Sequence, residues 1–311
     1  MKLAMVFPGQ GSQAVGMLKG YAGLPGIDAV RAEAAAALGV DFLKLLDEGP
    51  AEQLNLTVNT QPAMVTAAIA AYRAWIAAGG PAPAIVAGHS LGEYSALVAA
   101  GALSFGAALP LVRFRAQSMQ EAVPDGQGAM AAILGLDDDA ARAACAEAAQ
   151  GEVVQAVNFN APGQVVIAGH KSAVARAIEA CKARGAKRAM PLPVSAPFHS
   201  SLMQPAADKL KVYLSNIQMS VPGIPLVNNV DVKIETDPNA IKNALVRQAA
   251  SPVRWAETIR QMAEQGVTHV VECGPGKVLA GLVKRIDSRL QGIAAADRAS
   301  LEQALATVKG G

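Results

Sequence analysis

Short apolar runs alternate along this chain with longer segments in which apolar side chains recur at helical spacing. The short runs predict strands at 2–7, 84–87, 226–230, 269–273 and 293–296. The longer segments predict helices at 27–46 with a break at Gly39, about 60–77 with a cap at Asn59 or Thr60, from about 91 onwards, 104–122, 201–214, 241–248, 251–265 with Ser251-Pro252 at its start, from 276 to about 286, and 301–308. Strands that alternate with helices favour a mainly parallel sheet with helices on both faces, so we expect an α/β fold.

The middle of the chain follows a different order after the break at Val123-Pro124-Asp125-Gly126. Its patterns predict strand 129–136, helix 137–150, strand 153–159, strand 164–168, helix 172–184 and strand 189–194. This β-α-β-β-α-β order is typical of ferredoxin-like domains. We therefore expect a small ferredoxin-like domain at 124–194, inserted into a large α/β domain made of 1–123 and 195–311.

One short motif lies between the apolar run 84–87 and the helix that follows it. Gly88-His89-Ser90-Leu91-Gly92 matches G-x-S-x-G, which forms a nucleophile elbow when it falls at a strand-to-helix turn. Ser90 is therefore the candidate nucleophile, although a plain strand–helix turn is the alternative. The N–H groups of Leu91 and of Gln10, in the glycine-rich loop after the first strand, are the candidate oxyanion donors. That loop lacks the glycine spacing of a dinucleotide fingerprint and the Lys-Ser/Thr of a P-loop.

A serine needs a neighbouring base, and the chain offers four histidines. His89 should point away from the serine, His170 follows a strand of the small domain, and His269 opens an apolar strand. His199 lies in a loop at the domain junction, where pockets tend to form, and is the preferred base. This order differs from serine, acid, histidine in α/β-hydrolases, and no acidic residue is placed to orient His199. We expect a dyad with a backbone carbonyl that fixes the imidazole tautomer.

Two further features of the sequence, an arginine pair and a short turn segment, leave alternatives open. Arg113 and Arg115 lie within the apolar stripe of the 104–122 helix, where spacing favours side chains that extend to solvent. The other possibility is a buried guanidinium that binds a carboxylate. The segment Asn160-Ala161-Pro162-Gly163 is either a plain hairpin turn or part of a pocket.

Composition narrows the function classes. A net charge of +2 and the absence of a basic tract with interleaved aromatic residues give no support for nucleic-acid binding. The three cysteines are scattered, so they predict neither a metal site nor a disulfide framework, and they favour a reducing compartment. No signal peptide and no apolar run of about 18 residues is visible, so we expect a cytoplasmic protein without a membrane span.

Six motifs occur together in one order and cover essentially the whole chain. They are Phe7-Pro8-Gly9-Gln10-Gly11-Ser12-Gln13, Thr60-Gln61-Pro62-Ala63, Gly88-His89-Ser90-Leu91-Gly92-Glu93, Pro197-Phe198-His199-Ser200, Val227-Asn228-Asn229 and Glu272-Cys273-Gly274-Pro275-Gly276. With them the chain closely resembles the malonyl-CoA:acyl carrier protein transacylase family of bacterial fatty acid synthesis. The resemblance implies an α/β-hydrolase-like large domain with the inserted ferredoxin-like domain.

The resemblance also implies a reaction. Ser90 attacks the malonyl thioester, and His199 acts as general base and then as acid. Arg115 matches the arginine that binds the malonyl carboxylate, which replaces the solvent-exposed expectation for that residue. Gln10 and Leu91 match the oxyanion amides.

Other residues match supporting positions of the family. Gln248 matches the residue whose main-chain carbonyl holds the histidine, and Gln61 and Asn160 match pocket residues. Phe198 resembles the residue found in malonyl-selective rather than methylmalonyl-selective members.

The implied substrates are malonyl-CoA and the phosphopantetheine thiol of acyl carrier protein, in a ping-pong transfer without metal or cofactor by a monomer. Lys187-Arg188 and Lys284-Arg285 are candidate contacts for an acidic carrier protein, or ordinary solvated surface. The alternatives are a serine thioesterase or hydrolase, a malonyl or methylmalonyl transferase of polyketide synthesis, and a non-catalytic carrier-protein docking module.

Overall fold

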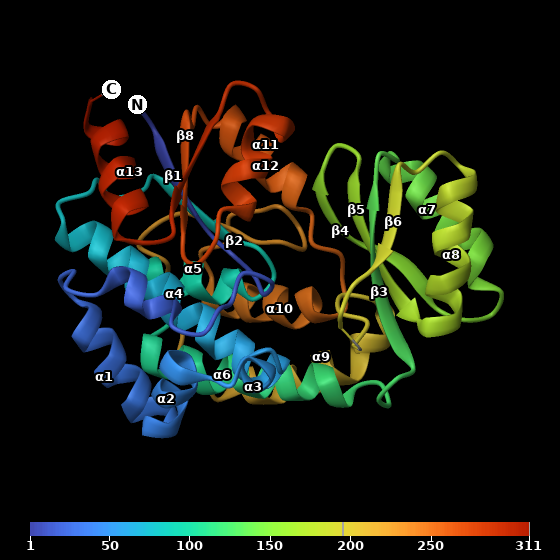
Figure 1. The fold of residues 1–311 in the computed structure, drawn as a ribbon, viewed down its shortest axis with the longest axis horizontal. Helices are drawn as coiled ribbons and strands as arrows, with labels where there is room; N and C mark the ends of the chain where they lie inside the picture. The colour runs from blue at the N-terminus through green and yellow to red at the C-terminus, as the bar shows by residue number, and fades with distance from the viewer. Residues whose placement is uncertain (195, 311) are drawn as a thin grey trace.

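A computed structural model describes residues 1–194 and 196–310, so the residue at which the chain was expected to return to the large domain, Ser195, lies outside the described part. Two sheets stand side by side in it (Figure 1). The larger sheet has the strand order β7-β2-β1-β8-β9, and its paired neighbours are all parallel. Its strands are β1 (Leu3–Phe7), β2 (Ile85–Gly88), β7 (Leu226–Val227), β8 (His269–Cys273) and β9 (Gln291–Ala295). The predicted parallel sheet is confirmed.

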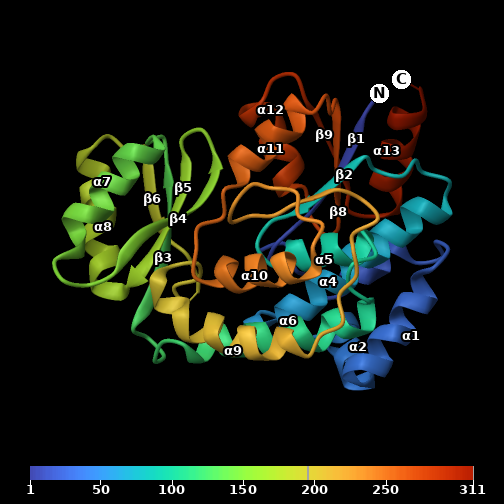
Figure 2. The same cartoon turned by 180° about the vertical axis from the view of Figure 1, so that it is seen from behind.

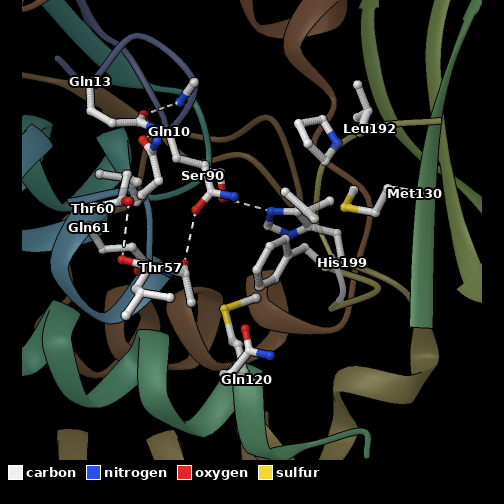
Figure 3. Close-up of a pocket in the computed structure, with 18 of the residues that line it drawn as sticks. Gln10, Gln13, Thr57, Thr60, Gln61, Ser90, Gln120, Met130, Leu192 and His199 are labelled. Carbon is white, nitrogen blue, oxygen red and sulfur yellow. Dashed lines mark hydrogen bonds between the residues drawn. The ribbon is translucent and has the colours of Figure 1, made fainter. Parts of the chain in front are cut away.

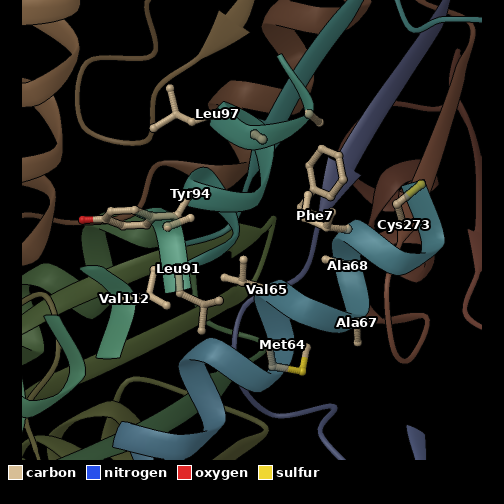
Figure 4. Packing of buried hydrophobic residues seen from close by; sticks show 14 of the residues in the cluster. Phe7, Met64, Val65, Ala67, Ala68, Leu91, Tyr94, Leu97, Val112 and Cys273 are labelled. Atoms are coloured by element: carbon tan, nitrogen blue, oxygen red, sulfur yellow. The ribbon is translucent and has the colours of Figure 1, made fainter. Parts of the chain in front are cut away.

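The central strand β1 is buried along its whole length, as a strand covered on both faces must be. Its residues alternate between two separate cores. Met5 and Phe7 join a large cluster on one face, and Ala4 and Val6 join a smaller cluster on the other. Figure 4 shows Phe7 in the large cluster beside the helix that contributes Val65 and Ala68.

Helices cover both faces of this sheet (Figures 1 and 2). The smaller cluster includes residues of α11 (Trp255–Glu264) and α12 (Val278–Ile286). The larger cluster lies between the sheet and the other helices. These are η1 (Met17–Tyr21), α1 (Ile27–Leu38), α2 (Val40–Glu48), α3 (Ala51–Leu54), α4 (Thr57–Ala77), α5 (Gly92–Ala99), α6 (Phe105–Glu121), η2 (Ser201–Met203), α9 (Gln204–Ser215), α10 (Pro238–Ala249) and α13 (Arg298–Gly310). None of the helices in the described ranges combines the length and apolar composition that crossing a bilayer requires.

The smaller sheet is antiparallel and has the strand order β4-β5-β3-β6. Two helices share a third hydrophobic core with it, so the predicted β-α-β-β-α-β unit is confirmed. Its elements are β3 (Gly128–Leu134), α7 (Asp138–Ala149), β4 (Val154–Ala161), β5 (Gln164–His170), α8 (Lys171–Ala183) and β6 (Arg188–Pro191).

The expected helix start at Ser251-Pro252 is wrong, since α11 begins only at Trp255. The segment before it is extended because it pairs with β4. Val253 N–H donates to Val157 O at 2.8 Å, and Phe159 N–H donates to Val253 O at 3.0 Å. This pairing joins the smaller sheet to the segment that precedes α11, a long-range contact that local pattern does not reveal.

Two other local expectations also need correction. The long helix α4 is capped at Leu56 rather than at Asn59 or Thr60, because the Thr60 hydroxyl donates to the carbonyl of Leu54 at 2.6 Å instead of accepting from an N–H group. Asn160 belongs to β4, so the turn that joins β4 to β5 is shorter than expected and contains Gly163 at φ 71°.

We expect Gly92→Ala to destabilise the fold. A Cβ at Gly92 would lie 2.2 Å from the carbonyl oxygen of Phe7, a backbone atom that cannot move alone. Overpacking of this kind costs on the order of 2 kcal/mol or more in the free energy of unfolding, measurable by urea denaturation.

Gly106→Ala is the matched control, since a Cβ at this helical glycine meets nothing within 4 Å. Its unfolding free energy should stay the same or rise by about 0.5–1 kcal/mol. Equal stabilities of the two alanine variants would contradict the close approach at Gly92.

Candidate active site

Ser90 occupies a sharp turn between β2 and α5, where it has φ 53°. The flanking glycines make this turn possible because a Cβ at Gly88 would lie 1.9 Å from the carbonyl carbon of Gly92. Ser90 N–H donates to Asn229 Oδ1 at 2.7 Å, so the strained backbone is held from outside the turn. The motif therefore has the strand–turn–helix context of a nucleophile elbow, not of a plain turn.

His199 lies in the loop just before η2, and its ring is directly beside the serine (Figure 3). Ser90 Oγ lies 2.7 Å from His199 Nε2, and His199 Nδ1 lies 2.8 Å from the main-chain oxygen of Gln248. A carbonyl oxygen only accepts, so Nδ1 carries the proton and Nε2 is free to accept the serine proton. The arrangement is the expected dyad with a backbone carbonyl.

Burial sets the charge state of this imidazole. His199 is 3% exposed, and desolvation together with the nearby Arg115 guanidinium lowers its pKa from 6.5 to about 3. The hydrogen bond to Gln248 O opposes this change but does not cancel it. His199 is therefore neutral at physiological pH, the form in which a base can take a proton.

Arg115 points from α6 into the interior and is 1% exposed. Its Nη1 donates to Gln61 Oε1 at 2.8 Å, and its Nη2 donates to Gln248 Oε1 at 2.9 Å and to Ser90 Oγ at 3.2 Å. The expectation from spacing alone, a side chain that extends to solvent, is thus wrong for Arg115. Arg113 remains partly exposed, with its guanidinium 5.5 Å from the centre of the Phe42 ring.

A buried carboxylate, Glu93 in the first turn of α5, connects the groups behind the dyad. Its Oε2 accepts from Gln248 Nε2 at 2.9 Å and from Asn229 N–H at 3.0 Å. Gln248 Nε2 also donates to Ser90 O at 2.9 Å, so Ser90 is held through both its N–H and its carbonyl. Burial raises the pKa of Glu93 to about 7.

A cavity of about 940 Å³ opens in front of these groups. Seven of the expected site residues line it: Gln10, Gln61, Ser90, Leu91, Arg115, Phe198 and His199. Gln248 lies behind His199 instead. Asn160 lies behind His89, to which it is joined by a 2.8 Å contact between Asn160 Oδ1 and His89 Nε2. Within the described ranges, no group of three or more His, Cys, Asp or Glu side chains is arranged to hold a metal ion.

Comparison with known proteins agrees with this geometry. The family described as "Acyl transferase domain" matches residues 4–301. The malonyl CoA-acyl carrier protein transacylase of Escherichia coli strain K12 is 58% identical over 305 residues, which are 98% of this chain and 99% of that protein. This chain belongs to the malonyl CoA-acyl carrier protein transacylase family. The resemblance found in the six motifs is confirmed.

Solved structures of similar proteins match this chain over nearly its whole length. The crystal structure of an acyl-carrier-protein S-malonyltransferase from Burkholderia pseudomallei 1710b has a TM-score of 0.96 and 64% identity, covering 98% of this chain and 99% of that one. A malonyl-transacylase solved in complex with a type II PKS acyl-carrier protein has a TM-score of 0.96 and 55% identity, covering 99% of this chain and 100% of that one.

Sequence reasoning missed several residues of the site. Glu93 and Asn229 stood in the motifs without a role, although a carboxylate one helical turn after a nucleophile and an asparagine beyond the carboxyl end of a strand are both detectable signals. Asn158, Met130 and Leu192 line the cavity from the small sheet and its continuation. Figure 3 shows Met130 and Leu192 on this side of it. No pattern in the chain indicated that this sheet faces the serine.

The lowered pKa of His199 predicts how stability depends on pH. The unfolded imidazole binds a proton near pH 6.5 and the folded one only near pH 3, so the unfolded state takes up the extra proton as pH falls and folding stability is lost. Between pH 6.5 and 5 the wild type should lose roughly 1.5 kcal/mol more than His199→Gln. Urea denaturation of both proteins across this range measures the difference, and parallel pH dependences would contradict a buried neutral imidazole.

Proposed function

We propose that this protein transfers the malonyl group from malonyl-CoA to the phosphopantetheine thiol of acyl carrier protein, through a malonyl ester on Ser90. The observation that supports this most directly is a buried, fixed cation beside a serine–histidine pair, with Arg115 Nη2 3.2 Å from Ser90 Oγ. A small acyl group with a free carboxylate at its far end fits both groups at once. The named relatives act in the same chemistry, since the E. coli protein is a malonyl CoA-acyl carrier protein transacylase.

The proposed ping-pong sequence begins with acylation. The Ser90 hydroxyl proton moves to His199 Nε2 as Oγ attacks the thioester carbonyl. The N–H groups of Gln10 and Leu91 stabilise the oxyanion. The carbon–sulfur bond then breaks, and His199 returns its proton to the departing CoA thiolate.

The second half uses the same groups in reverse. His199 takes the proton of the phosphopantetheine thiol, and the sulfur attacks the malonyl ester. The bond to Ser90 Oγ breaks, and Oγ recovers the proton from His199. No metal or cofactor enters any of these steps, which need only the chain's own groups and the two substrates.

Arg115 is proposed to bind the malonyl carboxylate as a charge-assisted pair, with Gln61 holding the guanidinium in place. Phe198 forms part of the cavity wall, and we propose that it limits the space for a methyl branch on the acyl chain. Asn160 contributes indirectly by holding His89.

We further propose the domain boundaries expected from the sequence, 124–194 for the insert and 1–123 with 195–311 for the large domain. We propose a cytoplasmic monomer that binds neither nucleic acid nor membrane. The three cysteines are free and buried, which suits a reducing compartment.

Intact-protein mass spectrometry after mixing with malonyl-CoA tests the proposal. Wild type should gain the mass of one malonyl group and lose it again on addition of phosphopantetheinylated carrier protein, whereas Ser90→Ala should gain nothing. Rapid release of malonate into water without carrier protein would instead support a thioesterase. Absence of loading on the wild type would support a docking module.

Arg115→Ala should cut malonyl loading by about 10²–10³-fold, because a desolvated charge pair is worth on the order of 2–5 kcal/mol. Acetyl loading from acetyl-CoA should survive or rise, since a neutral acyl group leaves a buried guanidinium unpaired in the wild type. Arg113→Ala, two residues away on the same helix, is the matched control and should load malonyl like the wild type. An equal loss for malonyl and acetyl would show that Arg115 is not the selector.

The two basic pairs, Lys187-Arg188 and Lys284-Arg285, differ in whether their side chains are already held by other residues. Arg285 Nη1 donates to Gln164 Oε1 at 2.9 Å, while Lys187, Arg188 and Lys284 are exposed. We expect Arg188→Glu to raise KM for the acidic carrier protein several-fold, with KM for malonyl-CoA unchanged. Lys211→Glu, an exposed reversal on α9, serves as control. Identical KM values for carrier protein in both variants would exclude Arg188 from the contact.

A further inference from the structure

The guanidinium of Arg115 forms no ion pair with any residue that the structure describes. Among the described residues, no carboxylate oxygen lies within ion-pair distance of it, and its hydrogen bonds go to the neutral oxygens of Gln61, Gln248 and Ser90. Glu93 attracts it electrostatically without forming an ion pair, and the Gln248 amide lies between the two groups, accepting from Arg115 and donating to Glu93. A buried cation is therefore left without an ion-pair partner, at a position where it contacts the nucleophile itself.

This contact affects the serine. Ser90 Oγ donates its proton to His199 and accepts from Arg115 Nη2, so one of its two lone pairs is engaged before any substrate arrives. A carboxylate is a stronger acceptor for a guanidinium than a hydroxyl is. A substrate carboxylate at this position would compete with Ser90 Oγ for Nη2.

The same cation affects the histidine. When His199 takes the serine proton it becomes a second buried positive charge, and Arg115 repels it. Burial comes first among the causes that hold the pKa of His199 down, and Arg115 comes second. A carboxylate paired with Arg115 would cancel that repulsion at the step in which the imidazolium forms.

We propose that the malonyl carboxylate activates the Ser90–His199 pair as well as anchoring the substrate, because it draws Arg115 away from Ser90 Oγ and supplies the negative charge that protonation of His199 requires. This inference rests on the proposed function and adds to it. Selection against neutral acyl groups then acts on the rate of acylation, not only on binding. When the site holds only water or an acetyl group, Arg115 stays hydrogen-bonded to Ser90 Oγ and Ser90 remains a weaker nucleophile.

The test separates the carboxylate from the thioester. Acetyl-CoA supplies the thioester and sodium formate supplies the carboxylate, at ionic strength held constant with sodium chloride. Acetylation of Ser90, followed by intact-protein mass spectrometry, should accelerate at least tenfold in the wild type and should saturate with formate concentration. Arg113→Met should respond like the wild type. Arg115→Met should acetylate faster than the wild type without formate and show no response to it.

The occupancy of formate is measured separately, as competitive inhibition of malonyl loading on the wild type. Formate that blocks malonyl loading without accelerating acetylation would overturn the inference. This outcome is distinct from failure of the proposed function, which would appear as absence of malonyl loading in the wild type without formate.

A second measurement does not depend on formate affinity. Nuclear magnetic resonance of ring-labelled histidine follows the titration of His199 in substrate-free wild type and Arg115→Met. The inference expects the titration midpoint of His199 to rise by at least one pH unit in Arg115→Met. An unchanged midpoint in a folded variant would overturn it.

Discussion

The backbone of α5 approaches the end of β1 so closely that only a glycine fits between them. A Cβ added at Gly92 would lie 2.2 Å from the carbonyl oxygen of Phe7, and one added at Gly88 would collide with the carbonyl of Gly92. This contact fixes the position of the turn that contains Ser90. It also places Ser90 next to the loop after β1, which contains Gln10. Any outward shift of α5 would move the serine hydroxyl away from His199, Arg115 and the candidate oxyanion amide of Gln10 together.

The network behind the serine has one self-consistent set of hydrogen bonds. The Gln248 side-chain amide lies between a carboxylate that only accepts and a guanidinium that only donates. Its nitrogen must therefore face Glu93 and its oxygen must face Arg115. The main-chain carbonyl of the same residue accepts from His199. One residue thus couples the orientation of the base to that of the cation, and the hydrogen bonds it makes on both sides restrict how either group can move.

Sequence reasoning succeeded where a signal is local and failed where a partner comes from far along the chain. Short apolar runs and helical patterns recovered the parallel sheet and the β-α-β-β-α-β insert, and Gly-x-Ser-x-Gly located the elbow. Ser251-Pro252 matched the pattern of a helix start, yet the next residue, Val253, pairs with β4, almost a hundred residues earlier in the chain. Spacing also misjudged Arg115, whose partners Gln61 and Gln248 are 54 and 133 residues away. Only the family resemblance supplied that assignment.

The position of β1 has a consequence for how the chain is made. The first strand pairs on one side with β2, at Ala4 and Ile85, and on the other with β8, at Leu3 and His269. During synthesis one edge of this apolar strand stays without its hydrogen-bonding partner until β8, more than 260 residues later, has been made. The strands of the inserted unit, which pair with one another, are all made well before that. The sheet is therefore completed only when β8 and then β9 are added on this side of β1, and loss of both strands would leave one edge of β1 unpaired and exposed to aggregation.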